Sequence, residues 1–308
     1  MTPIAWNAVA RTEPCMVALG NFDGVHLGHH RILETLLHES RVSGLNPVIV
    51  TFEPHPRYFF KPGERPSLLS TPAEKAALLS EWPVEVISLA FDAGLAGLPA
   101  EAFIEEFLKT RLRGRRFLLG HDHRFGKGAK GDASLVQRHV EDPARDVLIV
   151  EPFRLDGETV SSSAIRVHLE AARIDQANRL LGRPFSYSGT VVRGDGRGRT
   201  LGFPTANLEV GYPWKAQAAL GVYGGRAAVQ GKEWKAIANI GRHPTFGGDA
   251  VKIEVHLLDF QGDLYDGPLS FKLECAVRPE KKFPSAEALR EQIGHDIAFV
   301  RNQPEIPR

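Results

Sequence analysis

The chain has 308 residues, of which 43% are hydrophobic and 24% charged, and its formal net charge at pH 7 is +1. This composition is typical of a globular protein that can build real cores, and the length favours about two domains, at ~150 residues per domain. The near-neutral charge argues against a nucleic-acid partner held by bulk electrostatics.

The two cysteines, Cys15 and Cys275, stand at opposite ends of the chain. They form neither a disulfide framework nor a paired-cysteine metal site, so a reducing compartment fits best. The N-terminus lacks a basic segment followed by an apolar one, which predicts no signal peptide. No run approaches the ~18 consecutive apolar residues of a membrane span. We therefore expect a cytoplasmic protein with no membrane partner.

The first part of the chain alternates short apolar runs with helical patterns. Apolar residues at helical spacing predict helices around 32–37, 76–79 and 103–108, and Thr71 to Glu74 indicates a capped helix start with a first-turn proline. The predicted strands between them are 16–19, 47–52, 84–91, 117–120 and 146–153. This alternation predicts an α/β domain with a parallel sheet and a ligand site at the carboxyl ends of its strands.

After residues 182–184 the sequence pattern changes to short segments separated by glycine and proline turns. Such segments predict antiparallel strands of a barrel or sandwich. The predicted strands are 188–192, 224–229, 234–240, 251–259 and 269–277. A final amphipathic helix is predicted at 286–300, behind Ser285 as its cap. We place the domain boundary at residue 184, which gives domains 1–184 and 185–308.

The stretch GNFDGVHLGHH at 20–30 sits where the first strand would turn into the first helix. A helix N-terminus offers free backbone N–H groups and a positive dipole end, which suit a phosphate. His26 and His29 would share one face of the first turn, donate to phosphate oxygens and stabilise charge that develops at phosphorus. We interpret the anion as a nucleoside triphosphate tail. Two alternatives are a zinc site, for which no third ligand stands at a convincing spacing, and surface histidines without a role.

The same stretch resembles the Gly-x-Phe-Asp-Gly-x-His-x-Gly-His signature of the adenylyltransferase module of bacterial FAD synthetases, part of the wider nucleotidylyltransferase group. Three further stretches resemble family segments in the expected order: TFEPHP at 51–56, GHDHRFG at 120–126 and VSSSAIR at 160–166. Two positions depart from the family pattern. His123 stands where an aromatic residue such as Phe is usual, and Ser163 stands where Thr is usual.

The resemblance implies roles for single residues in this half. Ser162, Ser163 and Arg166 make sense as hydroxyl donors and a guanidinium that grip triphosphate oxygens, although Ser162 could also cap the helix that follows. The other implied ATP and phosphate contacts are Gly20, Asn21, Phe22, Asp23, Gly24 and Gly28. The implied flavin contacts are Pro54, His55, Asp122 and Arg124.

A second glycine-rich stretch, GDGRGRTLGFPTAN, occupies residues 194–207. A dinucleotide-binding motif is disfavoured, because Pro204 follows at once and no helix can start where that motif requires one. A glycine-rich turn with basic residues could instead wrap a nucleotide's phosphates, or form an ordinary hairpin. Thr205 and Asn207 would project to the same side of an extended segment. Their oxygens are hard ligands suited to Mg²⁺.

GRTLGFPTANL is very similar to the Gly-Arg-x-Leu-Gly-Phe-Pro-Thr-Ala-Asn signature of riboflavin kinases, which share a small β-barrel fold. Stretches at 221–223, 240–246 and 253–260 continue the resemblance, and 278–283 resembles the family's barrel exit, which would help close the flavin site. Glu254 aligns with the family's general base, which takes the ribityl hydroxyl proton during attack on the γ-phosphate. A solvated strand glutamate is the alternative. The implied kinase ATP contacts are Gly194, Arg199, Gly202, Phe203 and Pro204.

The resemblance covers nearly the whole chain, which is identified as a member of the bifunctional riboflavin kinase and FAD synthetase family. It implies a nucleotidylyltransferase-type Rossmann-like domain followed by a riboflavin-kinase β-barrel. The implied substrates are riboflavin, FMN and ATP, with Mg²⁺, in a monomer or weak homo-oligomer. A cytidylyltransferase or pantetheine-phosphate adenylyltransferase would explain only the first half. A catalytically silent flavin sensor or storage protein would need losses at His26, His29, Thr205, Asn207 or Glu254, and all five are present.

Overall fold

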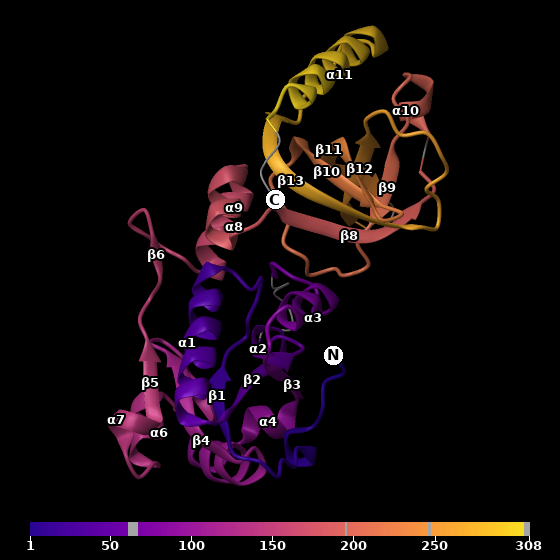
Figure 1. Ribbon diagram of the computed structural model, residues 1–308. Helices are drawn as coiled ribbons and strands as arrows, with labels where there is room; N and C mark the ends of the chain where they lie inside the picture. The colour runs from indigo at the N-terminus through magenta and orange to yellow at the C-terminus, as the bar shows by residue number, and fades with distance from the viewer. Residues whose placement is uncertain (61–66, 195, 246–247, 305–308) are drawn as a thin grey trace. The chain divides into compact units, whose positions relative to one another are not determined.

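The computed structural model describes residues 1–60, 67–194, 196–245 and 248–304 (Figure 1). Asp195 and Phe246, which belong to two of the predicted motif stretches, lie outside the described residues. The chain divides into two compact units, Met1–Ser162 and Ser163–Arg308. This division counts α9 (Ile174–Leu181) with the second unit, whereas the predicted boundary at residue 184 follows that helix. The two units are described separately below.

The first unit is built on a parallel sheet with the strand order β3-β2-β1-β4-β5. The strands are β1 (Cys15–Leu19), β2 (Asn46–Glu53), β3 (Glu85–Ala90), β4 (Gly114–Gly120) and β5 (Val147–Val150). Chain order reverses direction between β1 and β4, so the ends of these two neighbours form the switch point at which α/β sheets bind ligands. The predicted parallel sheet is confirmed. The last strand ends earlier than predicted because Pro152 has no N–H to continue the ladder.

Helices cover both faces of this sheet, because alternate residues of the buried central strand point to opposite sides. Met16 and Ala18 pack with α1 (Leu27–Ser43) and α3 (Pro72–Ser80), whereas Val17 and Leu19 pack with the π-helical segment η2 (Phe103–Arg111). The shorter elements are η1 (Trp6–Ala8), α2 (Pro56–Phe60), α4 (Ala93–Gly97), α5 (Ala100–Ala102), η3 (Lys127–Ala129), α6 (Ala133–Arg138), α7 (Pro143–Asp146), β6 (Arg154–Leu155) and β7 (Glu158–Thr159).

The second unit begins at Ser163, one residue into α8 (Ser162–Glu170), and continues through α9 into a closed antiparallel barrel. Its strands follow one another around the barrel as β10-β11-β12-β9-β8-β13. They are β8 (Phe185–Val192), β9 (Ala206–Glu209), β10 (Gly221–Val229), β11 (Lys232–Thr245), β12 (Gly248–Leu257) and β13 (Pro268–Pro279). Of the two predicted architectures, barrel and sandwich, the structure has the barrel.

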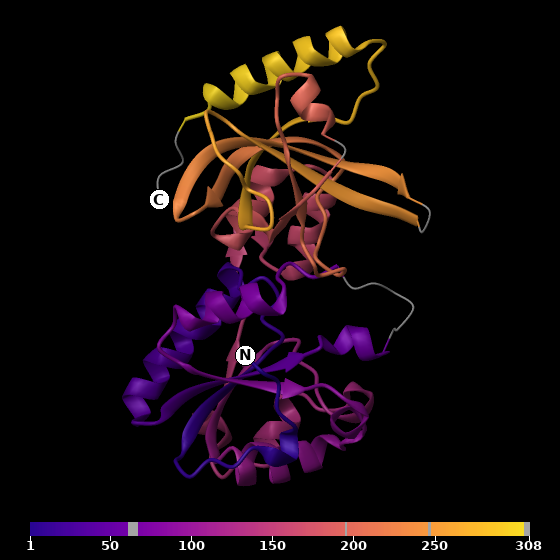
Figure 2. The same ribbon diagram turned by 90° about the vertical axis from the view of Figure 1, so that its right-hand side faces the viewer.

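The final helix, α11 (Ala286–Arg301), starts as predicted, with the Ser285 hydroxyl accepting a hydrogen bond from the Ala288 N–H at 3.2 Å. It lies along the outside of the barrel (Figure 2), where Val300 packs against Val222 and Ile237. None of the described helices is long and apolar enough to span a bilayer.

The glycine-rich stretch contains a short helix, α10 (Arg197–Thr200), where only a turn was expected. Gly196 and Gly202 flank it with φ of +70° and +88°, a region that favours glycine. The chain therefore makes one helical turn and leaves it again before Pro204. A helix does start within this stretch, contrary to the expectation, but it ends at Thr200 after four residues.

Candidate active sites

The loop between β1 and α1 carries unusual backbone geometry. Phe22, Gly24 and Val25 all have positive φ, at 50°, 82° and 39°. L side chains, and β-branched ones above all, rarely adopt this region, and such strain persists where packing enforces it, often at functional sites. Phe22 and Val25 are fully buried and supply that packing. The loop is thus held in one conformation at the switch point of the sheet.

The structure brings His26 and His29 together at the start of α1. His26 is the N-cap, and the two rings stack with centroids 3.8 Å apart. The His26 backbone N–H donates to His29 Nδ1 at 3.3 Å, so a neutral His29 carries its proton on Nε2. A side chain at Gly28 would press on the His26 ring, its Cβ lying 3.1 Å from Nδ1. Contrary to the surface alternative, His26 is only 6% exposed.

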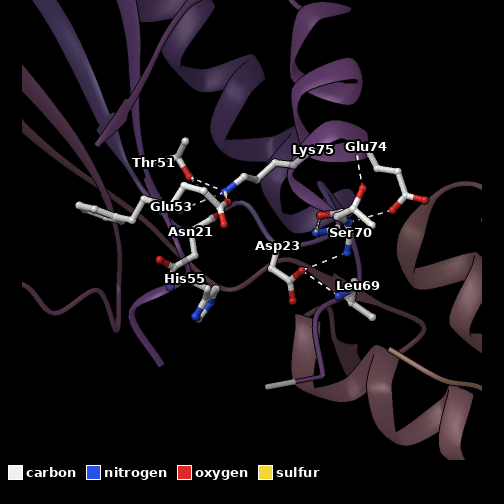
Figure 3. A network of polar contacts seen from close by, with 12 residues as sticks. Asn21, Asp23, Thr51, Glu53, His55, Leu69, Ser70, Glu74 and Lys75 are labelled. Atoms are coloured by element: carbon white, nitrogen blue, oxygen red, sulfur yellow. Dashed lines mark hydrogen bonds and ion pairs between the residues drawn. The ribbon is translucent and has the colours of Figure 1, made fainter. Parts of the chain in front are cut away.

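Asp23, predicted as a phosphate contact, also holds the loop in place through its own hydrogen bonds (Figure 3). Its carboxylate accepts hydrogen bonds from the backbone N–H groups of Leu69 and Ser70 at 2.8 and 3.2 Å. The Ser70 hydroxyl accepts the Gly24 N–H at 3.0 Å, and the Ser162 hydroxyl donates to the Asp23 carbonyl at 3.0 Å. Asp23 therefore fixes the backbone whose N–H groups and imidazoles would face an anion.

The remaining predicted phosphate residues take different positions. A Cβ at Gly20 would lie 3.0 Å from the Phe22 ring, and the centroid of that ring lies 5.0 Å from that of the His29 ring. Ser163 and Arg166 lie on α8. Their contact with phosphate stays a prediction.

Predicted site residues line a cavity of about 710 Å³ in the second unit and one of about 330 Å³ in the first. The smaller one is lined by Asn21, Asp122, Arg124 and several aromatic rings. These rings are Phe52, Phe60, Phe91, Phe103 and Phe125. An aromatic slot with a few polar groups suits a flat heteroaromatic ring. Pro54 and His55, at the end of β2, are not among the residues that line it.

His123 belongs to the wall of this aromatic cavity. Its ring stacks on Phe125 with centroids 6.2 Å apart, and burial lowers its pKa to about 4. The imidazole is therefore uncharged at neutral pH and serves as an aromatic ring, in keeping with the aromatic residue usual at this position. Arg124 forms an ion pair with Asp132 at 2.6 Å, which anchors the same loop to the start of α6.

The larger cavity is lined by Phe203, Thr205 and Glu254, all predicted for the kinase site. Strand pairing explains which polar side chains lie beside Glu254. Asn207 of β9 lies opposite Glu254 of β12, and Glu254 lies opposite Asn239 of β11, so these side chains share one face of the barrel. Ile253 and Val255 point the other way, into the barrel core, as the alternation predicts.

Two of the glycines allow the glycine-rich segment to pack closely on the candidate metal ligands. A Cβ at Gly194 would lie 2.1 Å from Asn207 Nδ2, and one at Gly198 would lie 3.0 Å from Thr205 Oγ1. Asn207 is only 7% exposed, and its Oδ1 has no hydrogen-bond partner within the part of the chain that the structure describes. A buried, unsatisfied carbonyl oxygen beside a threonine hydroxyl fits a hard cation.

His256 and Asn239, for which no role was predicted, also line this cavity. His256 donates from Nδ1 to the Pro204 carbonyl at 2.7 Å, and its ring meets the Phe203 ring edge-on. It therefore holds the signature segment in place. The sequence could have indicated this position, because His256 lies two residues after Glu254 and residues two apart on a strand share one face. Glu254 itself pairs with Lys252 at 2.8 Å.

The other kinase predictions fall at the edges of this region. Arg199 and Pro204 line a smaller cavity of about 110 Å³ that shares Thr205 with the large one. The predicted barrel exit does border the large cavity, where Arg278 and Lys281 both lie over the Phe283 ring, at 5.4 and 5.6 Å.

A Rossmann-like unit with stacked histidines at its switch point is followed by a barrel whose cavity holds a carboxylate near buried polar side chains. This combination is that of a two-domain nucleotide-dependent transferase. Residues 8–164 match the family model for FAD synthetase, and residues 181–303 match that for riboflavin kinase. The chain belongs to the bifunctional riboflavin kinase/FMN adenylyltransferase family.

Several curated relatives match over most of their length. The bifunctional riboflavin kinase/FMN adenylyltransferases of Pseudomonas fluorescens and Escherichia coli K12 are both 38% identical, covering 93% and 95% of this chain and 92% and 93% of their own. That of Bacillus subtilis is 34% identical over 91% of this chain and 90% of its own. A crystal structure described as a macrolide-efflux protein from Streptococcus pneumoniae is similar in fold over 98% of this chain and 99% of its own, with a TM-score of 0.88 and 29% identity.

Proposed function

We propose that the barrel site phosphorylates riboflavin to FMN and that the α/β site adenylylates FMN to FAD, with release of pyrophosphate. The observation that carries this assignment is the placement of each site inside a different family match. The stacked histidines fall within 8–164, and the cavity with Glu254 and Thr205 falls within 181–303. The relatives are named as enzymes, and nothing supports a silent flavin-binding protein.

At the α/β site, a phosphate oxygen of FMN attacks the α-phosphorus of ATP. The bond from that phosphorus to the β-phosphate oxygen breaks, and pyrophosphate leaves. His29 Nε2–H, the His26 ring and the N-terminal N–H groups of α1 stabilise the charge that develops on the phosphate oxygens. The aromatic cavity, with Asp122 and Arg124 at its wall, receives the flavin ring.

At the barrel site, Glu254 accepts the proton of the terminal ribityl hydroxyl as that oxygen bonds to the γ-phosphorus. The bond to the β-phosphate oxygen breaks and ADP leaves. The segment from Gly194 to Pro204, including Arg199 and Gly202, holds the phosphates of ATP. Thr205 Oγ1 and Asn207 Oδ1 would hold Mg²⁺, which neutralises phosphate charge when bound.

Replacing Asn207 with alanine should raise the Mg²⁺ concentration needed for half-maximal riboflavin phosphorylation by at least about 10-fold, because a direct ligand is lost. The measurement is a Mg²⁺ titration of FMN formation at saturating ATP. FMN adenylylation by the same preparation is the internal control and should keep its Mg²⁺ dependence. An unchanged titration of the kinase reaction would remove Asn207 from the metal site.

Fragments cut at residue 184 should separate the two activities. Fragment 1–184 should convert FMN to FAD without phosphorylating riboflavin, and fragment 185–308 should do the reverse, as measured by chromatography of the flavins. Phosphorylation of riboflavin by fragment 1–184 would contradict the division of labour.

The structure supplies a matched control for this experiment. Asn178 of α9 accepts the Phe185 N–H at 2.7 Å and donates to the Leu273 carbonyl at 2.8 Å, which ties the helix to the barrel. Fragment 163–308 keeps these bonds, whereas fragment 185–308 loses them. The longer fragment should therefore melt at a higher temperature while phosphorylating riboflavin with the same specificity.

A further inference from the structure

A lysine that the proposed chemistry does not use lies buried behind the α/β site. Lys75 of α3 is 6% exposed, and its Nζ faces three oxygens at the carboxyl end of β2 (Figure 3). They are Phe52 O at 3.2 Å, Thr51 Oγ1 at 3.4 Å and Glu53 Oε2 at 3.4 Å. Lysine is rarely buried unless its ammonium group is paired and hydrogen-bonded, because the charge must leave water.

The bonds around Thr51 have a fixed direction. An ammonium group only donates, so the Thr51 hydroxyl accepts from Lys75 and must use its single proton elsewhere. It donates to the Asn21 carbonyl at 3.1 Å. Asn21 belongs to the strained loop after β1 and also lines the aromatic cavity. Lys75 thus acts through one hydroxyl on the loop between β1 and α1, hereafter the phosphate loop.

The segment that leads into α3 contacts the same loop a second time. Leu69 and Ser70, just before α3, hold Asp23 and Gly24 through the hydrogen bonds given above. The loop is therefore tied to α3 on both sides of Phe22, once through Lys75 and Thr51 and once through Asp23. Burial lowers the pKa of Lys75, while the carboxylates of Glu53 and Asp23 favour its charged form.

The geometry points to Lys75 as a positioning residue for FMN adenylylation. Its ammonium fixes the end of β2 and, through Thr51, the Asn21 carbonyl, so that the phosphate loop and the flavin cavity keep the separation that in-line attack requires. This inference rests on the proposed adenylyltransferase site.

The test compares K75M, T51V and the double variant K75M/T51V in the full chain. K75M should lower kcat for FMN adenylylation about 10- to 100-fold, the effect expected when reacting groups are displaced by about 1 Å. KM for ATP and FMN should change far less, and riboflavin phosphorylation should be unchanged. K109M, which removes a half-exposed lysine of the same unit, should leave both reactions unchanged.

The double variant tests the relay itself. If Lys75 acts through Thr51, the double variant should be no slower than K75M alone, whereas independent effects would multiply. A normal kcat for K75M, or multiplied effects, would overturn the inference. If K75M does not fold, T51V decides, because it keeps Lys75 and removes only the hydroxyl. A normal kcat for T51V would then overturn the relay. Failure of the site assignment itself would show separately, as normal FAD synthesis by a chain lacking His26 and His29.

Discussion

Replacing both His26 and His29 with alanine should stop the chain at FMN. In the proposed mechanism each imidazole donates to phosphate oxygens as charge develops, and losing one such donor commonly costs ~10²–10³-fold in rate. The stability cost should be about 1 kcal/mol, because the rings stack on each other and His26 is buried. With riboflavin and ATP supplied, FMN should accumulate while FAD remains at background, as measured by separating the flavins over time.

His38 provides a matched control, since it is an exposed histidine further along the same helix. H38A should make FAD at the normal rate. Normal FAD output from the double variant would remove His26 and His29 from the mechanism altogether.

The zinc alternative predicts a different result from the same assay. Zinc would copurify with the chain, and a zinc-selective chelator would block FAD synthesis of the unchanged protein even with Mg²⁺ in excess. Within residues 1–60, 67–194, 196–245 and 248–304, no group of three or more His, Cys, Asp or Glu side chains is arranged to hold a metal. We therefore expect the chelator to have no effect.

The E254Q variant should lose kinase turnover by ~10²–10⁴-fold, the usual cost of removing a general base. Glutamine keeps the shape of the side chain at a position that borders the cavity, so riboflavin binding should stay near normal. FMN adenylylation, which uses the other unit, should be untouched. Stopped assays with riboflavin for one reaction and FMN for the other measure the two effects independently.

Glu209, an exposed glutamate at the end of β9, is the control for this substitution. E209Q should retain kinase turnover. If E254Q also retains it, Glu254 is a solvated strand residue whose role is limited to its ion pair with Lys252.

Much of the fold was predictable because local periodicity decides it. The parallel sheet follows from short apolar runs separated by helical stripes, and the capping box of α3 is visible as Thr71 and Glu74. The short strand β9 was predicted only as an extended segment, because its pairing with β8 and β12 is tertiary. The helical turn of α10 depends on two glycines at positive φ, which composition alone does not reveal.

The candidate sites were predictable where a motif is local in sequence. His26 and His29 are close because they are three residues apart at a helix start. Lys75 could not be predicted from the sequence, because its partner Thr51 lies on another element and only the fold brings them together. The hydrogen bonds to the Asp23 carboxylate could not be predicted for a similar reason, since the groups that donate them lie 46 and 47 residues away.

The central claim is that one chain carries two successive reactions at separate sites. Its most direct test is a time course of riboflavin, FMN and FAD after the full chain is mixed with riboflavin, ATP and Mg²⁺. The account predicts that FMN rises first, that FAD follows, and that pyrophosphate appears in step with FAD. FMN formation without any FAD, or conversion of supplied FMN to FAD with no phosphorylation of riboflavin, would contradict it.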